Sequence, residues 1–408
     1  MVYFLYRYMM QVVALVAKNT GFLNSRLRDR NIGLKSQEIE AMNHCVWIHC
    51  ASLGEFEQGK VLIDELRLRY PDKKLVLTFF SSSGFGKKRN YDRVDQVLYL
   101  PYDTPAAMGK FVSRLQPELV IFVKYEFWFT LLDVLASRDI PFVFVSASFR
   151  PDQYLFRPFF SGLLEKIGKA AHLFVQNYDS KKLLNSHRYN EVSVSGDTRI
   201  DRVLELSQQE FNWPALREWT YDGMSVIAGS TWPKDEKLIL ESMPDFEHWK
   251  WVLAPHDVSQ EHINTLREEV GERAVFLSDI GMEKTIPANR NILVIDRIGL
   301  LSRIYRYGNI AYIGGGFGAG IHNTLEPAVY GLPLIFGPRY EKFQEAVDFW
   351  NLGTARVIQT SDDLDAALRY FENPVRRDEV AASLTEYFKE NAGATRKIMT
   401  TIEKLITQ

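Results

Sequence analysis

The sequence predicts two α/β domains, each built on a parallel sheet with helices on both faces. Its 408 residues are too many for one ordinary core, and 46% of them are hydrophobic, enough to fill two. Short apolar runs alternate with helical stretches from residue 46 onward, and this alternation begins again near residue 225. Continuous apolar runs are typical of strands that are buried on both faces, as they are in parallel sheets.

The first half contains seven apolar runs, separated by helical stretches such as FEQGKVLIDELRLRY and TPAAMGKFVSRL. Pro71, Pro117 and Pro141 lie at the starts of runs, where a helix has already ended. The predicted strands are 46–51, 75–80, 97–100, 119–123, 142–147, 172–176 and 192–196.

A polar helical stretch over 197–219 contains no strand pattern and is interpreted as the connection between domains. After it, strands are predicted at 225–230, 249–255, 274–278, 292–296, 310–316, 332–338 and 355–359, and the tail from 361 to 408 is helical. Two such halves are expected to form a cleft between the carboxyl ends of their sheets, where ligands of open α/β sheets bind.

Charge and cysteine content exclude some classes of protein. The formal net charge of −2 gives no basic surface that would indicate a nucleic-acid partner. The two cysteines, Cys45 and Cys50, flank one predicted strand, where in-line residues cannot easily form a disulfide bond. A reducing compartment is therefore expected.

The amino terminus is apolar and aromatic. Residues 1–17, MVYFLYRYMMQVVALVA, are interrupted only by Arg7 and Gln11, which makes them too short for a membrane span of about 20 apolar residues. We expect a helix on a membrane surface, with cationic flanks facing anionic lipid. The flanking cations are Lys18, Arg26, Arg28, Arg30 and Lys35. A helix packed on its own domain is one alternative, and a cleavable signal peptide without a clear cleavage site is another.

The segment Ser52-Leu53-Gly54-Glu55 follows the first predicted strand and has two interpretations. Its S-x-x-E spacing is that of a capping box, in which Ser52 and Glu55 satisfy each other's backbone N–H groups. Its position at the end of a strand is where an open α/β sheet places chemistry. The spacing alone leaves both interpretations open.

The segment GSTWPKDE, residues 229–236, also follows a strand. Ser230 or Thr231 can cap a helix whose first turn holds Pro233 and Asp235. In the functional interpretation, the hydroxyl and backbone N–H groups of Gly229, Ser230 and Thr231 instead contact a phosphate or a sugar acid.

A glycine-rich loop follows the strand near residue 313, in GGGFGAGIHNTLEPAVYGLPLIFGP over 314–338. Asn323 and Glu326 can form a capping pair at the start of a helix. The glycines also allow a ligand to approach the backbone, and Glu326 could accept two ribose hydroxyls. The spacing fits a nicotinamide-dinucleotide fingerprint poorly.

Metal-binding patterns are weak. His256 and His262 are spaced badly for one helix face, and the Asp-x-Asp within Ser361–Asp365 opens a helix, which favours capping. We expect no metal site.

Taken together, the ordered motifs resemble the Kdo transferases, which add 3-deoxy-D-manno-octulosonic acid (Kdo) to a lipid A precursor in lipopolysaccharide core biosynthesis. The resemblance covers nearly the whole chain. The motifs are WIHCASLGE, TFFSSSG, KYEFW, SGDTRID, GSTW, APHD and GGGFGAGIHNTLEPA…GLPLIFGP.

The resemblance implies a GT-B-type fold of two Rossmann-like domains with parallel sheets that face each other across a cleft. The expected divisions are a membrane-associating segment 1–35, an acceptor domain 36–205, a CMP-Kdo domain 206–380 and a helix 381–408 that returns to the first domain. The reaction implied is an inverting, metal-independent transfer to lipid IVA, without a cofactor. Its place is the cytoplasmic face of the bacterial inner membrane.

The resemblance also assigns roles to residues. Glu55 would be the general base that takes the proton of the acceptor hydroxyl. Glu126 and Arg199 would stabilise the transition state, although the family usually has Lys where this chain has Arg199. Substrate contacts would come from Ser52, Gly54, Ser230, Thr231, Pro255, His256, Gly299, Leu300, Leu301, Asn323, Thr324, Leu325 and Glu326.

Three departures affect the nucleotide contacts more than the family resemblance. The usual Pro-Arg-His is Pro-His-Asp here, Gly-Glu is Gly-Leu at 299–300, and a glycine before the histidine is Ile321. Two other functions stay open. One is a soluble nucleotide-sugar enzyme such as a non-hydrolysing epimerase, and the other is an inactive lipid- or nucleotide-binding relative.

Overall fold

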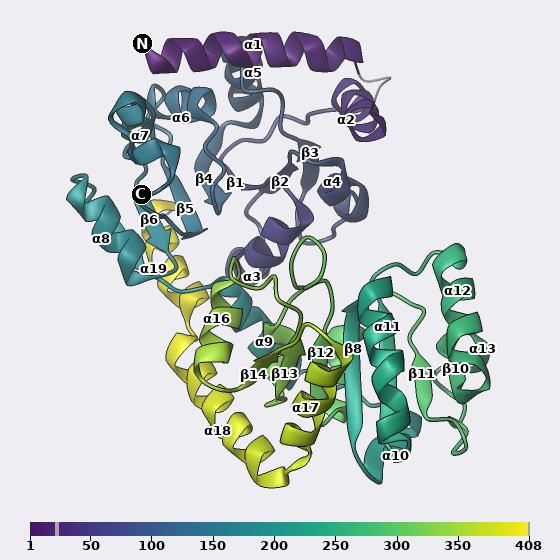
Figure 1. The fold of residues 1–408 in the computed structure, drawn as a ribbon. Coiled ribbons are helices and arrows are strands. Elements are labelled where there is room, and N and C mark those ends of the chain that lie inside the picture. The colour runs from purple at the N-terminus through teal and green to yellow at the C-terminus, as the bar shows by residue number, and fades with distance from the viewer. Residues whose placement is uncertain (21–23, 407–408) are drawn as a thin grey trace. The chain divides into compact units, whose positions relative to one another are not determined.

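Two seven-stranded parallel sheets carry the fold (Figure 1). The computed structural model describes residues 1–20 and 24–406. The chain divides into two compact units, of which the first comprises Met1–Arg202 and Asn391–Gln408 and the second comprises Val203–Glu390. The α/β class with two parallel sheets, predicted from the apolar runs, is confirmed.

The sheet of the first unit has the strand order β3-β2-β1-β4-β5-β6-β7. Every residue of β1 is buried, as its uninterrupted apolar run predicts. The strands are β1 Cys45–Cys50, β2 Leu75–Phe79, β3 Gln96–Tyr99, β4 Pro117–Val123, β5 Phe142–Ala147, β6 His172–Val175 and β7 Val192–Val194.

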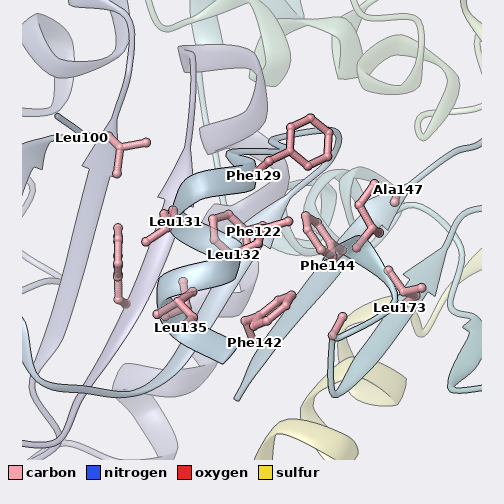
Figure 2. Packing of buried hydrophobic residues seen from close by; sticks show 14 of the residues in the cluster. Leu100, Phe122, Phe129, Leu131, Leu132, Leu135, Phe142, Phe144, Ala147 and Leu173 are labelled. Carbon is pink, nitrogen blue, oxygen red and sulfur yellow. The ribbon is translucent and has the colours of Figure 1, made fainter. Parts of the chain in front are cut away.

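Helices cover both faces of this sheet. On one face, α6 packs Leu131, Leu132 and Leu135 against the phenylalanines of β4 and β5 (Figure 2). On the other face, α3 packs together with Ile398 and Met399 of the carboxyl-terminal helix α19. The helices are α1 Val2–Thr20, α2 Ser25–Ser36, α3 Leu53–Arg69, α4 Ser82–Lys88, α5 Pro105–Leu115, α6 Phe129–Ala136, α7 Ser161–Ile167, α8 Tyr178–Ser186 and α19 Ala394–Ile406.

The sheet of the second unit has the order β10-β11-β9-β8-β12-β13-β14. Strand β12 ends at Ile313, three residues before the predicted end, and Gly315 leaves the strand conformation with φ near +92°. Gly314 packs closely on β8, because a Cβ there would lie 2.2 Å from the carbonyl oxygen of Ser230. The strands are β8 Ser225–Thr231, β9 Lys250–Pro255, β10 Ala274–Phe276, β11 Ile292–Val294, β12 Ile310–Ile313, β13 Leu334–Phe336 and β14 Ala355–Val357.

The helices of the second unit lie between these strands and in the tail, which is helical as predicted. Helices α9 Thr198–Gln208 and α18 Pro374–Asn391 contain the residues at which the two units divide. The others are α10 Pro214–Tyr221, α11 Pro233–Ser242, α12 Gln260–Val270, α13 Leu277–Ile280, α14 Leu301–Ile304, α15 Leu325–Ala328, α16 Gln344–Asn351 and α17 Ser361–Glu372.

Helix α1 packs on the first unit along one face and leaves its other face exposed (Figure 1). The Tyr3 hydroxyl donates to Asp133 of α6 at 2.9 Å, and the Tyr6 hydroxyl donates to the buried Asp103 at 2.6 Å. These contacts support the interpretation of a helix packed on its own domain, and the membrane-surface interpretation stays a prediction. The exposed large apolar side chains, each 41–70% accessible, are Phe4, Leu5, Tyr8, Met9, Val12, Val13, Leu15 and Val16.

One of the cations expected to flank α1 does not face outward. Arg30 is buried, and its guanidinium donates to the carbonyl oxygens of Phe80 and Leu100. These bonds hold α2 against the sheet, so the prediction of an outward-facing Arg30 is wrong. The other four flanking cations are exposed, namely Lys18, Arg26, Arg28 and Lys35. No helix in the described part of the chain combines the length and apolar character needed to cross a membrane.

Candidate active site

The strand order changes direction between β1 and β4 in the first unit and between β8 and β12 in the second. Ligands of open parallel sheets bind beside such a reversal, at the carboxyl ends of the strands. Eight of the sixteen residues singled out by sequence follow β1, β4 or β12, in the connecting loop or in the first turn of the next helix, and Ser230 and Thr231 end β8.

Glu55 lies in the first turn of α3, just after β1. The backbone N–H and the hydroxyl of Ser52 both donate to its Oε2, at 2.6 and 2.5 Å. The capping contact predicted from the S-x-x-E spacing is thus confirmed on the glutamate side. The side chain is only partly buried, and its Oε1 accepts no hydrogen bond from the described residues. One carboxylate oxygen is therefore anchored, while the other is left for a ligand.

Gly54 is exposed, and the fold does not require a glycine there. A Cβ at this position would have only the Ser52 Oγ nearby, at 3.8 Å. Gly59, one helical turn later, is different, because a Cβ there would meet Cys50 Sγ and Val123 at 3.1 Å. The space above Gly54 is open to a ligand.

Glu126 follows β4, and its side chain is 16% exposed. Its Oε2 lies 3.6 Å from Nε2 of His49, a fully buried residue of β1. Trp128 donates its indole N–H to the same Nε2 at 2.9 Å, which makes this nitrogen an acceptor. The proton of a neutral His49 is then on Nδ1, which lies 2.7 Å from the hydroxyl oxygen of Thr78.

The Cys50 thiol connects the two glutamates. Burial raises its pKa well above the ordinary value, and the negative charges of Glu55 and Glu126 raise it further. The thiol is therefore protonated and unreactive at neutral pH. Glu55 follows β1 and Glu126 follows β4, so the two glutamates come from the strands on either side of the reversal.

Arg199 lies at the start of α9, after β7, three strands beyond β4. Its guanidinium donates to Asp197 through Nε at 2.9 Å and Nη2 at 2.6 Å. The neighbouring Thr198 donates from its hydroxyl to the carbonyl oxygen of Gln58 in α3 at 2.7 Å. This bond ties the start of α9 to the helix that carries Glu55, while the charge of Arg199 is paired with Asp197.

Three aromatic rings gather beside the reversal in the second unit. Trp232 follows β8, His256 follows β9 and His322 follows β12. The Trp232 indole donates to His322 Nε2 at 3.1 Å, and His256 stacks on both rings at centroid distances of 4.7 and 4.4 Å. Burial, with a smaller effect from His256, lowers the pKa of His322 to about 4. His322 is therefore neutral at physiological pH, and the exposed His256 presents a flat face.

The expectation that Ser230 or Thr231 caps a helix is wrong. Trp232 is the residue before α11, and its backbone N–H donates to Asp235 at 2.9 Å. Thr231 is fully buried, and its hydroxyl donates to Glu236 at 2.9 Å, so it serves the fold. Ser230 has φ near +54°, a strained value for a residue with a side chain.

Asn323 and Glu326 make the predicted contact, with the Asn323 amide donating to Glu326 Oε1 at 3.0 Å. The helix begins later than predicted, because α15 starts at Leu325. Thr324 and Leu325 are fully buried, and so is Pro255 on β9.

Leu301 approaches the same area from α14. A Cβ at Gly229 would lie 2.0 Å from the hydroxyl of Tyr305 and 2.8 Å from Leu301, so both pack directly on this glycine. The negative charge of Glu326 adds to burial in raising the pKa of Tyr305, which places Glu326 near that ring. Gly299 is exposed, with φ near +99°, and Leu300 is half-buried beside it.

The weak metal patterns serve the fold. His262 contacts the buried Glu236 at 3.1 Å, and Asp363 caps α17 by accepting from the Gln359 and Thr360 N–H groups, which confirms the capping interpretation. Across the described ranges, no three His, Cys, Asp or Glu side chains are grouped as metal ligands.

Comparisons with known proteins show which family this chain resembles. The sequence profile described as 3-deoxy-D-manno-octulosonic-acid transferase (Kdotransferase) matches residues 24–202. A 3-deoxy-D-manno-octulosonic acid transferase of Rickettsia felis is 25% identical over 92% of this chain and 81% of its own length. The chain is therefore similar to Kdo transferases over most of its length, and these are glycosyltransferases of lipopolysaccharide biosynthesis.

Two further similarities concern the share of a longer relative that this chain covers and the fold that it shares with a solved structure. A bifunctional glycosyltransferase/methyltransferase of Fusobacterium nucleatum is 23% identical over 91% of this chain, which spans only 58% of that relative's length. The crystal structure of a UDP-GlcNAc 2-epimerase from Neisseria meningitidis, bound to UDP-GlcNAc, superposes with a TM-score of 0.61 at 16% identity. That match covers 88% of this chain and 99% of the epimerase. It shows a shared GT-B-like fold.

Sequence reasoning missed four side chains at the two reversals. They are His49, Trp128, Trp232 and His322. His49 had a usable signal, because a polar ring in the middle of the buried run VWIHCA needs hydrogen-bond partners. Its partners could not be identified without knowing which strands are neighbours.

Proposed function

We propose that this protein transfers Kdo from CMP-Kdo to a lipid A precursor, lipid IVA, with inversion at the anomeric carbon and without a metal ion. The acceptor hydroxyl oxygen forms the new bond to the anomeric carbon. The bond from that carbon to the cytidylate phosphate breaks, and the hydroxyl proton moves to Glu55. Similarity to Kdo transferases supports the reaction class, and the position of Glu55 carries the assignment of the base.

Glu55 has the properties that a general base needs. It follows β1 beside the reversal of strand order, and it is partly exposed. Ser52 holds Oε2 through two hydrogen bonds, which orients the carboxylate and leaves Oε1 to receive the proton. The open space over Gly54 gives the acceptor sugar room to approach.

Glu126 and Arg199 are proposed to stabilise the transition state. Glu126 lies in the loop whose Trp128 is bonded to His49, so its backbone is held against β1. Arg199 is held in place by Asp197, and this pairing lowers the net positive charge that it offers to an anionic substrate. We therefore expect Arg199 to contribute less through charge alone than an unpaired lysine would.

CMP-Kdo is proposed to bind to the second unit beside the reversal between β8 and β12. The exposed ring of His256 offers a stacking face for the cytosine base, since bases stack favourably on aromatic side chains. Glu326, held through Oε1 by Asn323, is suited to accept the ribose hydroxyls. Ser230, Gly299, Leu300 and Leu301 complete the proposed contacts. The buried Pro255, Thr231, Thr324 and Leu325 are proposed to act by shaping the backbone.

The exposed face of α1 is proposed to lie on the inner-membrane surface. Its apolar side chains are too many for an ordinary water-exposed helix, and cations flank them. The buried face of α1 contributes Ala14 and Ala17 to a cluster with Phe80, and Phe80 packs on Trp128 at a centroid distance of 4.6 Å. A lipid acceptor held in the membrane would therefore be close to the Glu126 loop.

Mass spectrometry of a reconstituted reaction tests the proposal. The full chain is incubated with lipid IVA in detergent micelles and with CMP-Kdo generated in place, and the lipid products are weighed. We expect a mass gain of one or more Kdo residues, with or without a chelator. No gain in any of these conditions would contradict the function. A parallel incubation with UDP-GlcNAc tests the epimerase alternative, which requires a change of sugar stereochemistry without lipid.

A further inference from the structure

A groove of about 390 Å³ runs between α1 and the first turn of α5. Arg7, Gln11 and Lys18 line it from α1, and Thr104 and Ala106 line it from the other side. The geometry points to a binding site for the phosphate headgroup of an anionic membrane lipid. This inference deepens the proposed function and rests on it, because it takes α1 to lie on a membrane.

The charge of the groove favours an anion. Arg7, Gln11 and Lys18 lie on one face of α1, four and seven residues apart, so their side chains project to the same side. Neither Arg7 nor Lys18 forms an ion pair with a carboxylate among the described residues. Asp103, next to Thr104, is fully buried and already accepts from Tyr6, Thr130 and Leu131, so it does not occupy the groove.

The wall formed by α5 adds neutral donors. Thr104 precedes the helix and makes no capping bond with its side chain, so its hydroxyl is available. Pro105 occupies the first helical position, and Ala106 follows it in the first turn, where peptide N–H groups have no intrahelical acceptor. A phosphate needs several donors around one anionic group, and the groove gathers charged and neutral donors from two elements.

The location of the groove identifies the source of the phosphate. Leu15 lines the groove and is 64% exposed, so the groove opens onto the same apolar face that is proposed to enter the membrane. Phosphates lie at the level of the membrane surface, just above the acyl chains that such a face contacts. A headgroup would therefore reach Arg7 and Lys18 while Leu15 and its neighbours contact the chains.

Vesicle co-sedimentation of the full chain tests this inference. Affinity is measured for vesicles of phosphatidylcholine alone and for vesicles that also contain phosphatidylglycerol. The readout is the ratio of the affinity for the phosphatidylglycerol-containing vesicles to the affinity for phosphatidylcholine alone. The groove pair Arg7→Gln/Lys18→Gln is compared with Arg26→Gln/Arg28→Gln, which removes two exposed cations from the neighbouring helix α2. Diffuse attraction, at about 1 kcal/mol per cation, would reduce the ratio equally, up to about 30-fold, for both pairs.

We expect the groove pair to reduce the ratio at least several-fold more than the α2 pair. Gln11→Leu keeps the charge and adds apolar surface, so we expect it to lower the ratio without weakening binding to phosphatidylcholine. Equal losses for the two pairs, together with an unchanged ratio for Gln11→Leu, would overturn the inference. A titration with inorganic phosphate at matched ionic strength separates the sources. Binding of free phosphate in the groove as tight as binding to vesicles would overturn the assignment to a lipid.

Kdo transfer by the same variants, measured in detergent micelles, separates this inference from the proposed function. If the wild type transfers Kdo but the groove pair loses no more vesicle binding than the α2 pair, the lipid site in the groove is overturned and the proposed function is not. If the groove pair loses more vesicle binding than the α2 pair but the wild type transfers no Kdo, the lipid site in the groove is supported and the proposed function is contradicted.

Discussion

The indole N–H of Trp128 donates to Nε2 of His49 over 2.9 Å, and this bond crosses the reversal between β4 and β1. Trp128 belongs to the loop that carries Glu126, while His49 lies six residues before Glu55. The second unit contains a hydrogen bond of the same kind, because the indole of Trp232 donates to His322 across the reversal between β8 and β12. In each unit an indole and an imidazole join two segments that are distant in sequence.

Replacing Trp128 with Phe should slow turnover clearly while the protein stays folded. The variant keeps a ring against Phe80 but leaves Nε2 of the buried His49 without its donor, at a cost of about 1–3 kcal/mol. A shifted Glu126 loop should lower kcat by about tenfold or more, since small displacements of reacting groups are costly. Kinetics and thermal unfolding are measured together. Trp47→Phe, which removes the indole that donates to Thr78, is the control that should affect stability alone.

Replacing Tyr6 with Phe should loosen α1 from the first unit. The hydroxyl of Tyr6 donates to Asp103, which is buried and also accepts from the first N–H groups of α6. Losing this bond to a charged acceptor should cost about 1.5–3 kcal/mol and lower the Tm by several degrees. Tyr8→Phe on the exposed face should leave the Tm unchanged. Equal Tm values for the two variants would contradict the role of this contact.

Replacing Gly54 with Ala should separate folding from activity. The added Cβ meets no atom closer than 3.8 Å, and alanine favours a helix by up to about 1 kcal/mol over glycine. The Tm should therefore hold or rise. Turnover efficiency should fall if the acceptor approaches this surface, and an unchanged kcat/KM would remove Gly54 from the proposed site.

Stability of the second unit should depend on pH through His322. Its folded pKa of about 4 lies below the ordinary value of 6.5, so between these values the unfolded chain binds a proton that the folded chain does not. Stability is therefore lost as the pH falls from about 6.5 toward about 4. His322→Gln can still accept from Trp232 but does not titrate, so the Tm of the wild type should fall relative to that of this variant across the window. A constant difference would contradict the assignment.

Much of the fold was predictable, and the reasons are local. Each apolar run predicted a strand because a strand buried on both faces cannot include many polar residues, and all fourteen positions are occupied. The ends of strands were less predictable. Strand β12 stops at Ile313, shortly before Gly315 with φ near +92°, and the close contact of Gly314 with Ser230 depends on which strands are neighbours.

The candidate site was predictable only in part. The S-x-x-E spacing indicated the contact between Ser52 and Glu55 because both residues lie in one helical turn. The pairings of His49 with Trp128 and of Trp232 with His322 depend on the strand order, which the sequence does not state. Burial of Arg30 was missed for the same reason, since its acceptors lie after β2 and β3.

The central claim is that Glu55 accepts the proton of the acceptor hydroxyl, and one comparison tests it most directly. Kdo transfer and thermal unfolding are measured for Glu55→Gln and for Glu57→Gln, a matched change at an exposed position in the same turn of α3. Glutamine can still accept from Ser52, so both variants should keep the Tm of the wild type.

Loss of the base should slow Glu55→Gln by about 100- to 10,000-fold, whereas Glu57→Gln should keep full activity. Near-normal transfer by Glu55→Gln would contradict the account. So would a loss of activity that merely follows a loss of Tm and is recovered on cooling.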